Sequence, residues 1–125
     1  MPRAALKKVL IVDDERDLAE PLARRLVGDG RFEVEIALDG ADGARKARLL
    51  RPDAILLDLA MPEMDGWQLT GLLRADPRTR GATIIMMTAW LSPDLGRRAA
   101  AAGVSRLLLK PFQEADLMDA LGAAI

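Results

Sequence analysis

The stretch that decides the fold is Ile55-Leu56-Leu57-Asp58-Leu59-Ala60-Met61-Pro62-Glu63-Met64-Asp65-Gly66. The unbroken apolar run from Ala54 to Leu57 is typical of a short strand buried on both faces, as in a parallel sheet. Asp58 ends this run, and a carboxylate is costly to bury without a partner. Met61-Pro62 and Asp65-Gly66 predict a loop directly after the strand. Because ligands of open parallel sheets bind at the carboxyl ends of strands, Asp58 is a candidate site residue.

Four more short apolar runs surround this one along the chain. They predict strands at Lys8–Val12, Phe32–Ala37, Thr83–Thr88 and Arg106–Leu109. The second of these, FEVEIA, alternates between apolar and polar residues, which indicates a strand nearer a sheet edge.

Apolar residues at helical spacing fill the segments between the strands. They predict helices at Asp17–Val27, Ala41–Leu50, Trp67–Ala75, Pro93–Ala102 and Gln113–Ala124. Five strands that alternate with five helices favour a doubly wound parallel sheet with helices on both faces.

Particular residues predict where two of these helices begin and end. Asp17 followed by Glu20 fits a capping box, and Pro21 then predicts a late start or a mild kink. Ser92 is the expected N-cap of the fourth helix, with Pro93 at its first position, and Gly103 is expected to end it.

Length and composition predict one folded domain over residues 1–125 and exclude several functions. The chain has 18 Lys and Arg against 19 Asp and Glu, without a basic block, so we expect no direct nucleic-acid binding. It has no Cys and no His, which excludes disulfides, thiolate chemistry, catalytic triads with His and zinc sites with these ligands. Neither a membrane span nor a secretory leader is evident, so a cytoplasmic location is expected.

Polar side chains gather at the carboxyl ends of the predicted strands. The first strand leads to Asp13 and Asp14, the third to Asp58, the fourth to Thr88 and the fifth to Lys110. The ends of parallel strands meet at one rim, so these groups are expected to converge. Clustered carboxylates need a cation, and oxygen ligands alone favour a hard ion such as Mg²⁺. A carboxylate there could be the nucleophile that forms an aspartyl phosphate.

With these polar residues at the ends of its predicted strands, the sequence resembles the receiver domains of two-component response regulators. The resemblance rests on VLIVDDE at Val9–Glu15, LLDLAMPEMDGW at Leu56–Trp67, MTA at Met87–Ala89 and LKPF at Leu109–Phe112. It extends from Lys8 to about Leu121 and implies a flavodoxin-like (βα)5 fold with strand order 2-1-3-4-5.

The resemblance also implies a role for each site residue. Asp58 resembles the phosphoacceptor, Thr88 the switch hydroxyl and Lys110 the phosphate-binding lysine. Asp13 and Asp14 resemble the acidic pair that holds Mg²⁺ with Asp58, and Ala60 is expected to contribute its backbone carbonyl. Pro111 is expected to follow a cis peptide bond.

Two positions near the expected switch depart from the family pattern. Leu107 stands where the family usually has an aromatic residue, so switching is expected to use a Leu107 rotamer change or shifts around Ala89–Leu95. Trp90 is bulky for its position, and we hypothesise that Trp90 and Ala60 control the access of water to an acyl phosphate.

The resemblance predicts a phosphoryl-accepting switch rather than a classical enzyme. The donor would be a histidine kinase, a phosphotransfer protein or a small molecule, and the target a downstream effector or an output domain outside this chain. A homodimer through the last two helices is one candidate assembly, although the last helix lacks the arginine pattern of the DNA-binding members. Two alternatives are a phosphorylation-independent interaction domain and an aspartyl-phosphate hydrolase. Ala60 argues against the hydrolase, because those enzymes commonly carry a second Asp at this position.

Overall fold

The computed structural model describes residues 5–124, which alternate regularly between strands and helices. The strands are β1 (Lys7–Val12), β2 (Phe32–Ala37), β3 (Ala54–Asp58), β4 (Thr83–Thr88) and β5 (Arg106–Leu109). The helices are α1 (Arg16–Asp29), α2 (Gly40–Leu50), α3 (Gly66–Ala75), α4 (Leu95–Ala102) and α5 (Glu114–Ala124). None of the described helices is long and apolar enough to cross a membrane.

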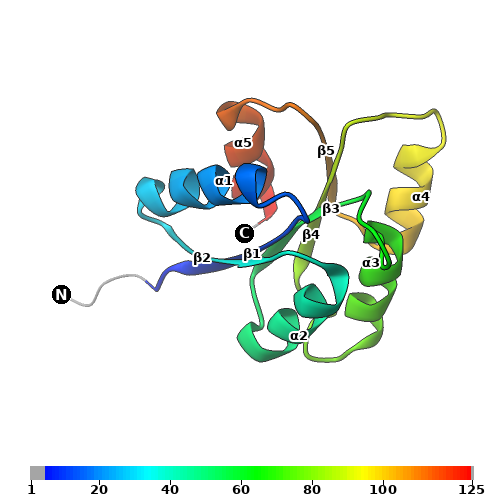
Figure 1. Ribbon diagram of the computed structural model, residues 1–125, viewed down its shortest axis with the longest axis horizontal. Helices are drawn as coiled ribbons and strands as arrows, with labels where there is room; N and C mark the ends of the chain where they lie inside the picture. The colour runs from blue at the N-terminus through cyan, green and yellow to red at the C-terminus, as the bar shows by residue number, and fades with distance from the viewer. Residues whose placement is uncertain (1–4, 125) are drawn as a thin grey trace.

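The five strands form one parallel sheet in the order β2-β1-β3-β4-β5. This order confirms the predicted doubly wound topology, and β2 lies at an edge as its alternating sequence indicated. Helices α1 and α5 cover one face of the sheet, while α2, α3 and α4 lie on the other (Figure 1). The central strands are therefore covered on both sides.

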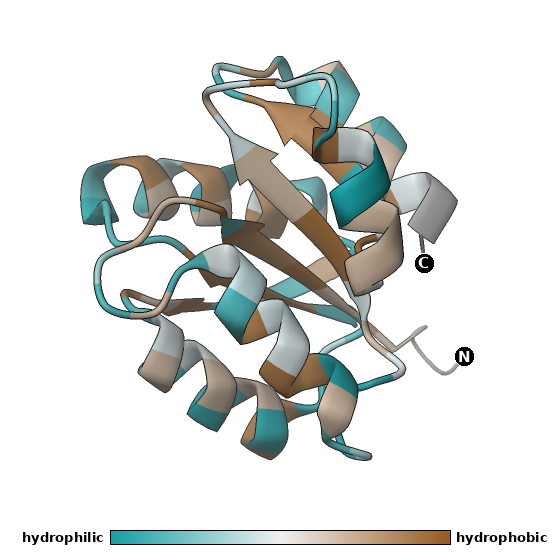
Figure 2. Cartoon of the chain, turned by 90° about the vertical axis from the view of Figure 1, so that its right-hand side faces the viewer, coloured by the Kyte–Doolittle hydropathy of each residue, from teal (hydrophilic) through white to brown (hydrophobic). Residues whose placement is uncertain are grey.

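Alternate residues of β3 contribute to two separate cores. Ala54 and Leu56 pack with residues of α1 and α5, whereas Ile55 and Leu57 pack with residues of α2, α3 and α4. All four side chains are fully buried. Figure 2 shows the hydrophobic colouring of the central strands between the helices. The unbroken apolar run of β3 thus has the two-sided burial that it predicted.

The predicted starts of α1 and α4 are wrong. Helix α1 begins earlier, at Arg16, and its N-cap is Glu15, which makes no side-chain capping bond. The amides of Leu18 and Ala19 both bond to the Glu15 carbonyl, so the first turn forms ahead of Asp17 and Pro21 lies inside the helix.

Helix α4 begins later than predicted, at Leu95, with Asp94 as an N-cap that also lacks a side-chain bond. Ser92 and Pro93 form a turn before it, in which the Leu95 amide bonds to the Ser92 carbonyl at 3.1 Å. Gly103 does end α4, with a φ of 91°, as predicted.

Arg74, in the last turn of α3, forms hydrogen bonds with two segments outside its own helix, the loop before β4 and the turn after α4. Its Nη1 donates to the carbonyls of Arg80 and Ala82, each at 2.6 Å. Its Nε and Nη2 donate to the Gly103 carbonyl at 3.1 and 2.6 Å. One guanidinium therefore links α3 to the loop before β4 and to the turn after α4.

We expect Arg74→Met to lower the free energy of unfolding by about 2–3 kcal/mol, because charge-assisted bonds are lost and partly buried carbonyls lose their donor. Urea unfolding followed by circular dichroism measures this change. Arg78→Met is the matched control, because among the described residues the Arg78 side chain pairs only with Asp76 at the surface, and its loss should cost much less stability. Equal losses in the two variants would contradict the role given to Arg74.

Candidate functional site: an acidic cluster at the carboxyl ends of the strands

The backbone of Asp58 is fixed by neighbouring strands and by the start of α3. Asp58 lies opposite Met87 in the sheet, and the next amide, of Leu59, donates to the Met87 carbonyl at 2.9 Å. The amide of Gly66 donates to the Leu59 carbonyl at 2.8 Å. A Cβ at Gly66 would lie only 2.8 Å from both the Asp58 carbonyl oxygen and the Leu59 Cα. Glycine is therefore required there for α3 to begin directly against the backbone of Asp58.

The loop between Asp58 and α3 is closed by a capping box. The Asp65 carboxylate accepts the Gln68 amide at 2.9 Å, and the Gln68 side chain accepts the Asp65 amide at 2.9 Å. These reciprocal bonds satisfy two amides at the start of α3. They fix where the loop ends and so help to hold Asp58 at the sheet edge.

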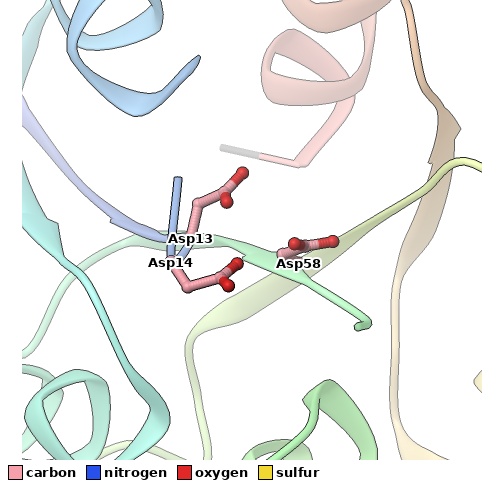
Figure 3. Close-up of side chains that lie close together, drawn as sticks. All are labelled: Asp13, Asp14 and Asp58. Carbon is pink, nitrogen blue, oxygen red and sulfur yellow. The ribbon is translucent and has the colours of Figure 1, made fainter. Parts of the chain in front are cut away.

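Three carboxylates meet at the carboxyl ends of β1 and β3. Asp13, Asp14 and Asp58 each place an oxygen within 4.8 Å of the others (Figure 3). Asp13 and Asp58 are buried, whereas Asp14 is exposed. The amide of Glu15 donates to the Asp13 carboxylate at 3.0 Å and helps to orient it. The structure thus brings together the three acids that the sequence grouped.

Lys110 supplies a positive charge to this cluster from the end of β5. Its Nζ lies 3.0 Å from Asp13 Oδ2 and 3.5 Å from Asp58 Oδ1. The Lys110 amide donates to the Thr88 carbonyl at 2.7 Å, which ties this residue to the end of β4. One ammonium cannot balance three carboxylates, so the cluster keeps a negative charge.

The environment perturbs the pKa values of both Asp58 and Lys110. Burial raises the pKa of Asp58, and the Asp13 carboxylate adds to this, against opposing effects of the Lys110 ammonium and the Ala60 backbone. Burial alone would lower the pKa of Lys110, but Asp13 and Asp58 outweigh it and the pKa is raised. Lys110 is therefore a cation at neutral pH, and a second cation near Asp58 would favour its ionised form.

A stability prediction follows from the raised pKa of Asp58. The folded state holds the Asp58 proton to a higher pH than the unfolded chain does. The free energy of unfolding therefore falls as the pH rises from the ordinary carboxyl pKa of 3.8 through the raised pKa of Asp58. Asp58→Asn cannot ionise, and in EDTA we expect it to unfold at a higher temperature than the native chain at pH 7. This advantage should vanish below the ordinary carboxyl pKa of 3.8. Thermal unfolding across this pH range measures it, and a variant less stable than the native chain at pH 7 would contradict the prediction.

The donor set fits a hard divalent cation. It consists of carboxylate oxygens only, grouped closely and with one ammonium for three negative charges. Mg²⁺ prefers such ligands and usually retains several waters. The exposed Asp14 leaves one side of the cluster open to solvent, where such waters could remain. The cluster could therefore bind Mg²⁺.

Thr88 ends β4 beside Asp58 and is buried, but its hydroxyl is engaged within its own loop. The hydroxyl donates to the Trp90 carbonyl at 3.0 Å and accepts the Trp90 amide at 3.1 Å. The Trp90 ring itself is 79% exposed. In this conformation Thr88 orders the loop that leads to α4.

The other predicted switch residues lie directly after β4, within β5 and after β5. Ala89 and Pro111 are exposed, and Leu107 is partly buried against the core on the α4 side of the sheet. The Lys110–Pro111 peptide bond is cis, as the resemblance implied.

Fold and site together define a receiver domain. The family pattern described as "Response regulator receiver domain" matches residues 9–122, and the chain belongs to this family. It is thus a receiver domain of a two-component response regulator. Receiver domains of this family are signalling proteins rather than classical enzymes.

The chain is similar to named regulators and to solved receiver structures. It is 40% identical over 111 residues to the transcriptional regulatory protein PrrA of Mycobacterium leprae, covering 89% of this chain and 46% of that protein. It is 36% identical over 112 residues to the DNA-binding response regulator MtrA of Mycobacterium tuberculosis, covering 90% of this chain and 47% of that protein. The structure of the Vibrio cholerae chemotaxis protein CheY4 matches with a TM-score of 0.90 and 32% identity, covering 97% of this chain and 100% of that one. The chain spans about half the length of the curated relatives.

Proposed function

We propose that Asp58 accepts a phosphoryl group from a histidine kinase, a phosphotransfer protein or a small-molecule donor, and that this changes the affinity of the chain for a downstream partner. The observation that carries the proposal is the grouping of Asp13, Asp14 and Asp58 with the Lys110 ammonium 3.5 Å from Asp58. A carboxylate beside fixed cations is suited to attack phosphorus, because the cations offset the negative charge of the incoming group.

In the proposed step an Asp58 oxygen forms a bond to phosphorus while the bond from phosphorus to the donor breaks. The donor leaves with the electron pair of that bond, and Asp58 becomes an acyl phosphate. Lys110 is a cation at neutral pH and would neutralise a phosphoryl oxygen. The buried position of Asp58 would keep most water away from the product.

Mg²⁺ would be held by Asp13, Asp14, Asp58 and the Ala60 carbonyl, and it would supply further positive charge to the phosphoryl oxygens. Thr88 ends β4, the strand next to β3, and so lies at the same sheet edge as Asp58. Its hydroxyl would exchange the Trp90 carbonyl for a phosphoryl oxygen, because an anionic acceptor forms the stronger bond. This exchange would release the loop from Ala89 onward.

The altered surface would include Ala89, Trp90 and Pro111, which follow the ends of β4 and β5, together with Leu107 within β5. The names of two relatives describe a transcriptional and a DNA-binding regulator, and this chain matches only about half of each. We therefore propose an effector protein or a linked output domain as the target, and not nucleic acid bound by residues 1–125. Dimerisation through α4 and α5 is a further proposal, and a cytoplasmic location fits this function.

The test is the intact mass of the native chain after incubation with acetyl phosphate, with Mg²⁺ or with EDTA. We expect one phosphoryl adduct that forms with Mg²⁺ and not with EDTA. No adduct under either condition would contradict phosphorylation and would favour the phosphorylation-independent interaction domain.

Trp90 allows a separate prediction about the lifetime of the phosphoryl group. If its side chain and Ala60 control the access of water, Trp90→Ala will change the rate at which the adduct is lost. Leu91→Ala is the matched control, because Leu91 is the next residue and is also exposed. The decay of the adduct mass after removal of the donor measures both rates. Equal rates for Trp90→Ala and the native chain would refute the role of Trp90.

A further inference from the structure

Helix α4 is held to the rest of the domain by few contacts. Only Leu95 and Ala99 are buried among its described residues. The residues that precede it, from Ala89 to Asp94, are all exposed, and the N-cap Asp94 makes no side-chain bond. Elements with so little buried surface are the ones that open or shift at low free-energy cost.

The two ends of α4 are restrained to different extents. At its C-terminal end, Arg74 donates two hydrogen bonds to the Gly103 carbonyl, at 3.1 and 2.6 Å. The missing Cβ of Gly103 makes room for this side chain, because a Cβ there would lie 2.9 Å from Arg74 Nε. The N-terminal end is held by the buried Leu95 side chain, but among the described residues no side chain of another element donates a hydrogen bond to it. A displacement of α4 would therefore be largest at Leu95 and smallest at Gly103.

Between these ends, the Arg98 side chain of α4 contacts Trp67 of α3. The Arg98 guanidinium carbon lies 4.4 Å from the centre of the Trp67 ring, which is a cation–π distance. Arg98 is exposed and Trp67 is partly buried. The neighbouring Arg97 instead pairs with Asp94, the N-cap of the same helix, and within residues 5–124 this pair joins α4 to no other element.

Trp67 is also linked to the backbone of Asp58 through its neighbour in the chain, Gly66. It follows Gly66, whose Cα lies against the Asp58 carbonyl and Leu59. A small shift of the Asp58 loop would move the start of α3 and with it the ring that Arg98 covers. The loop from Thr88 to Trp90 gives a second connection between the cluster and α4.

We propose that the Trp67–Arg98 contact holds α4 in the position that it has before phosphorylation, and that α4 pivots about the Arg74–Gly103 bonds when the contact is lost. This inference rests on the proposed function of Asp58. A cation–π contact at an exposed site changes a two-state equilibrium by about two- to fivefold. Removing it should raise the population of the displaced conformation by this factor. The rate of phosphorylation should rise with it, because the displaced conformation is the one proposed for the phosphorylated chain.

The test compares Arg98→Met with Arg97→Met, since both remove one charge from adjacent positions of α4. We expect amide exchange of the unphosphorylated chain to accelerate by about two- to fivefold in peptides that cover residues 95–102 of Arg98→Met only. We also expect Arg98→Met, and not Arg97→Met, to form the acetyl phosphate adduct about two- to fivefold faster. In NMR spectra the indole N–H signal of Trp67 should shift when the native chain is phosphorylated.

The amide-exchange arm needs no phosphoryl group, so the two proposals can fail separately. Unchanged exchange and an unchanged adduct rate in Arg98→Met would overturn the role of the contact while the proposed function stands. Equal effects of Arg97→Met and Arg98→Met would overturn it as well. A complete lack of adduct in every variant would overturn the proposed function and the coupling of α4 to it.

Discussion

Asp58→Asn is expected to abolish the phosphoryl adduct that acetyl phosphate forms with the native chain. The substitution keeps the size of the side chain but replaces the nucleophilic carboxylate by an amide. Asp13 and Asp14 remain, yet neither occupies the position that β3 and Gly66 give to Asp58. Intact mass spectrometry after incubation with acetyl phosphate and Mg²⁺ measures the difference, which should be all or none.

Glu63→Gln is the matched control for this experiment. It removes one negative charge from the same loop, at an exposed residue outside the acidic cluster. We expect it to form the adduct like the native chain. An adduct on Asp58→Asn at the native level would mean that another residue is the acceptor, and loss of the adduct in both variants would point to a general effect of charge.

Among substitutions that add one methyl group at the site, Gly66→Ala is expected to lower the free energy of unfolding most. The new Cβ would lie 2.8 Å from two backbone atoms, the Asp58 carbonyl oxygen and the Leu59 Cα, and 3.0 Å from Leu57 Cδ1. Backbone atoms cannot rotate away, so either α3 or the end of β3 must move. We expect the free energy of unfolding to fall by about 3 kcal/mol and the rate of adduct formation to fall with it.

Gly71→Ala is the control, because Gly71 lies in the same helix and a Cβ there meets nothing within 4 Å. This variant should gain about 0.5–1 kcal/mol from the higher helix propensity of alanine. Urea unfolding measures both changes. A loss in Gly71→Ala equal to that in Gly66→Ala would show that α3 tolerates no alanine at all and would refute the close-approach argument.

The acidic cluster could be predicted because Asp13 and Asp58 each end an apolar run and Asp14 follows Asp13 directly. In a parallel sheet the carboxyl ends of β1, β3, β4 and β5 meet at one rim, so Asp13, Asp58, Thr88 and Lys110 could be placed at the same sheet edge. Distances, burial and the pairing of Lys110 with both carboxylates required the structure. The strand order itself came from the family resemblance.

The helix starts and the Arg74 contacts could not be predicted from local sequence. Glu15 begins α1 although it is not a favoured N-cap residue, because the Asp13 carboxylate accepts its amide and directs the chain into the first turn. The carbonyl acceptors of Arg74 lie 6, 8 and 29 residues away in the sequence. No periodicity or motif indicates such contacts. Gly66 carried a local signal, as part of Asp65-Gly66, but this signal indicated a turn and not an approach of α3 to Asp58.

The most direct test of the central claim is to locate the phosphoryl group on the native chain. Treatment of the phosphorylated protein with borohydride reduces an aspartyl phosphate to homoserine with release of inorganic phosphate, and tandem mass spectrometry then identifies the converted residue. We predict conversion at Asp58 alone, dependent on both Mg²⁺ and the phosphodonor. Conversion at Asp13 or Asp14, or no conversion at any residue while the adduct is present, would contradict the assignment of Asp58 as the acceptor.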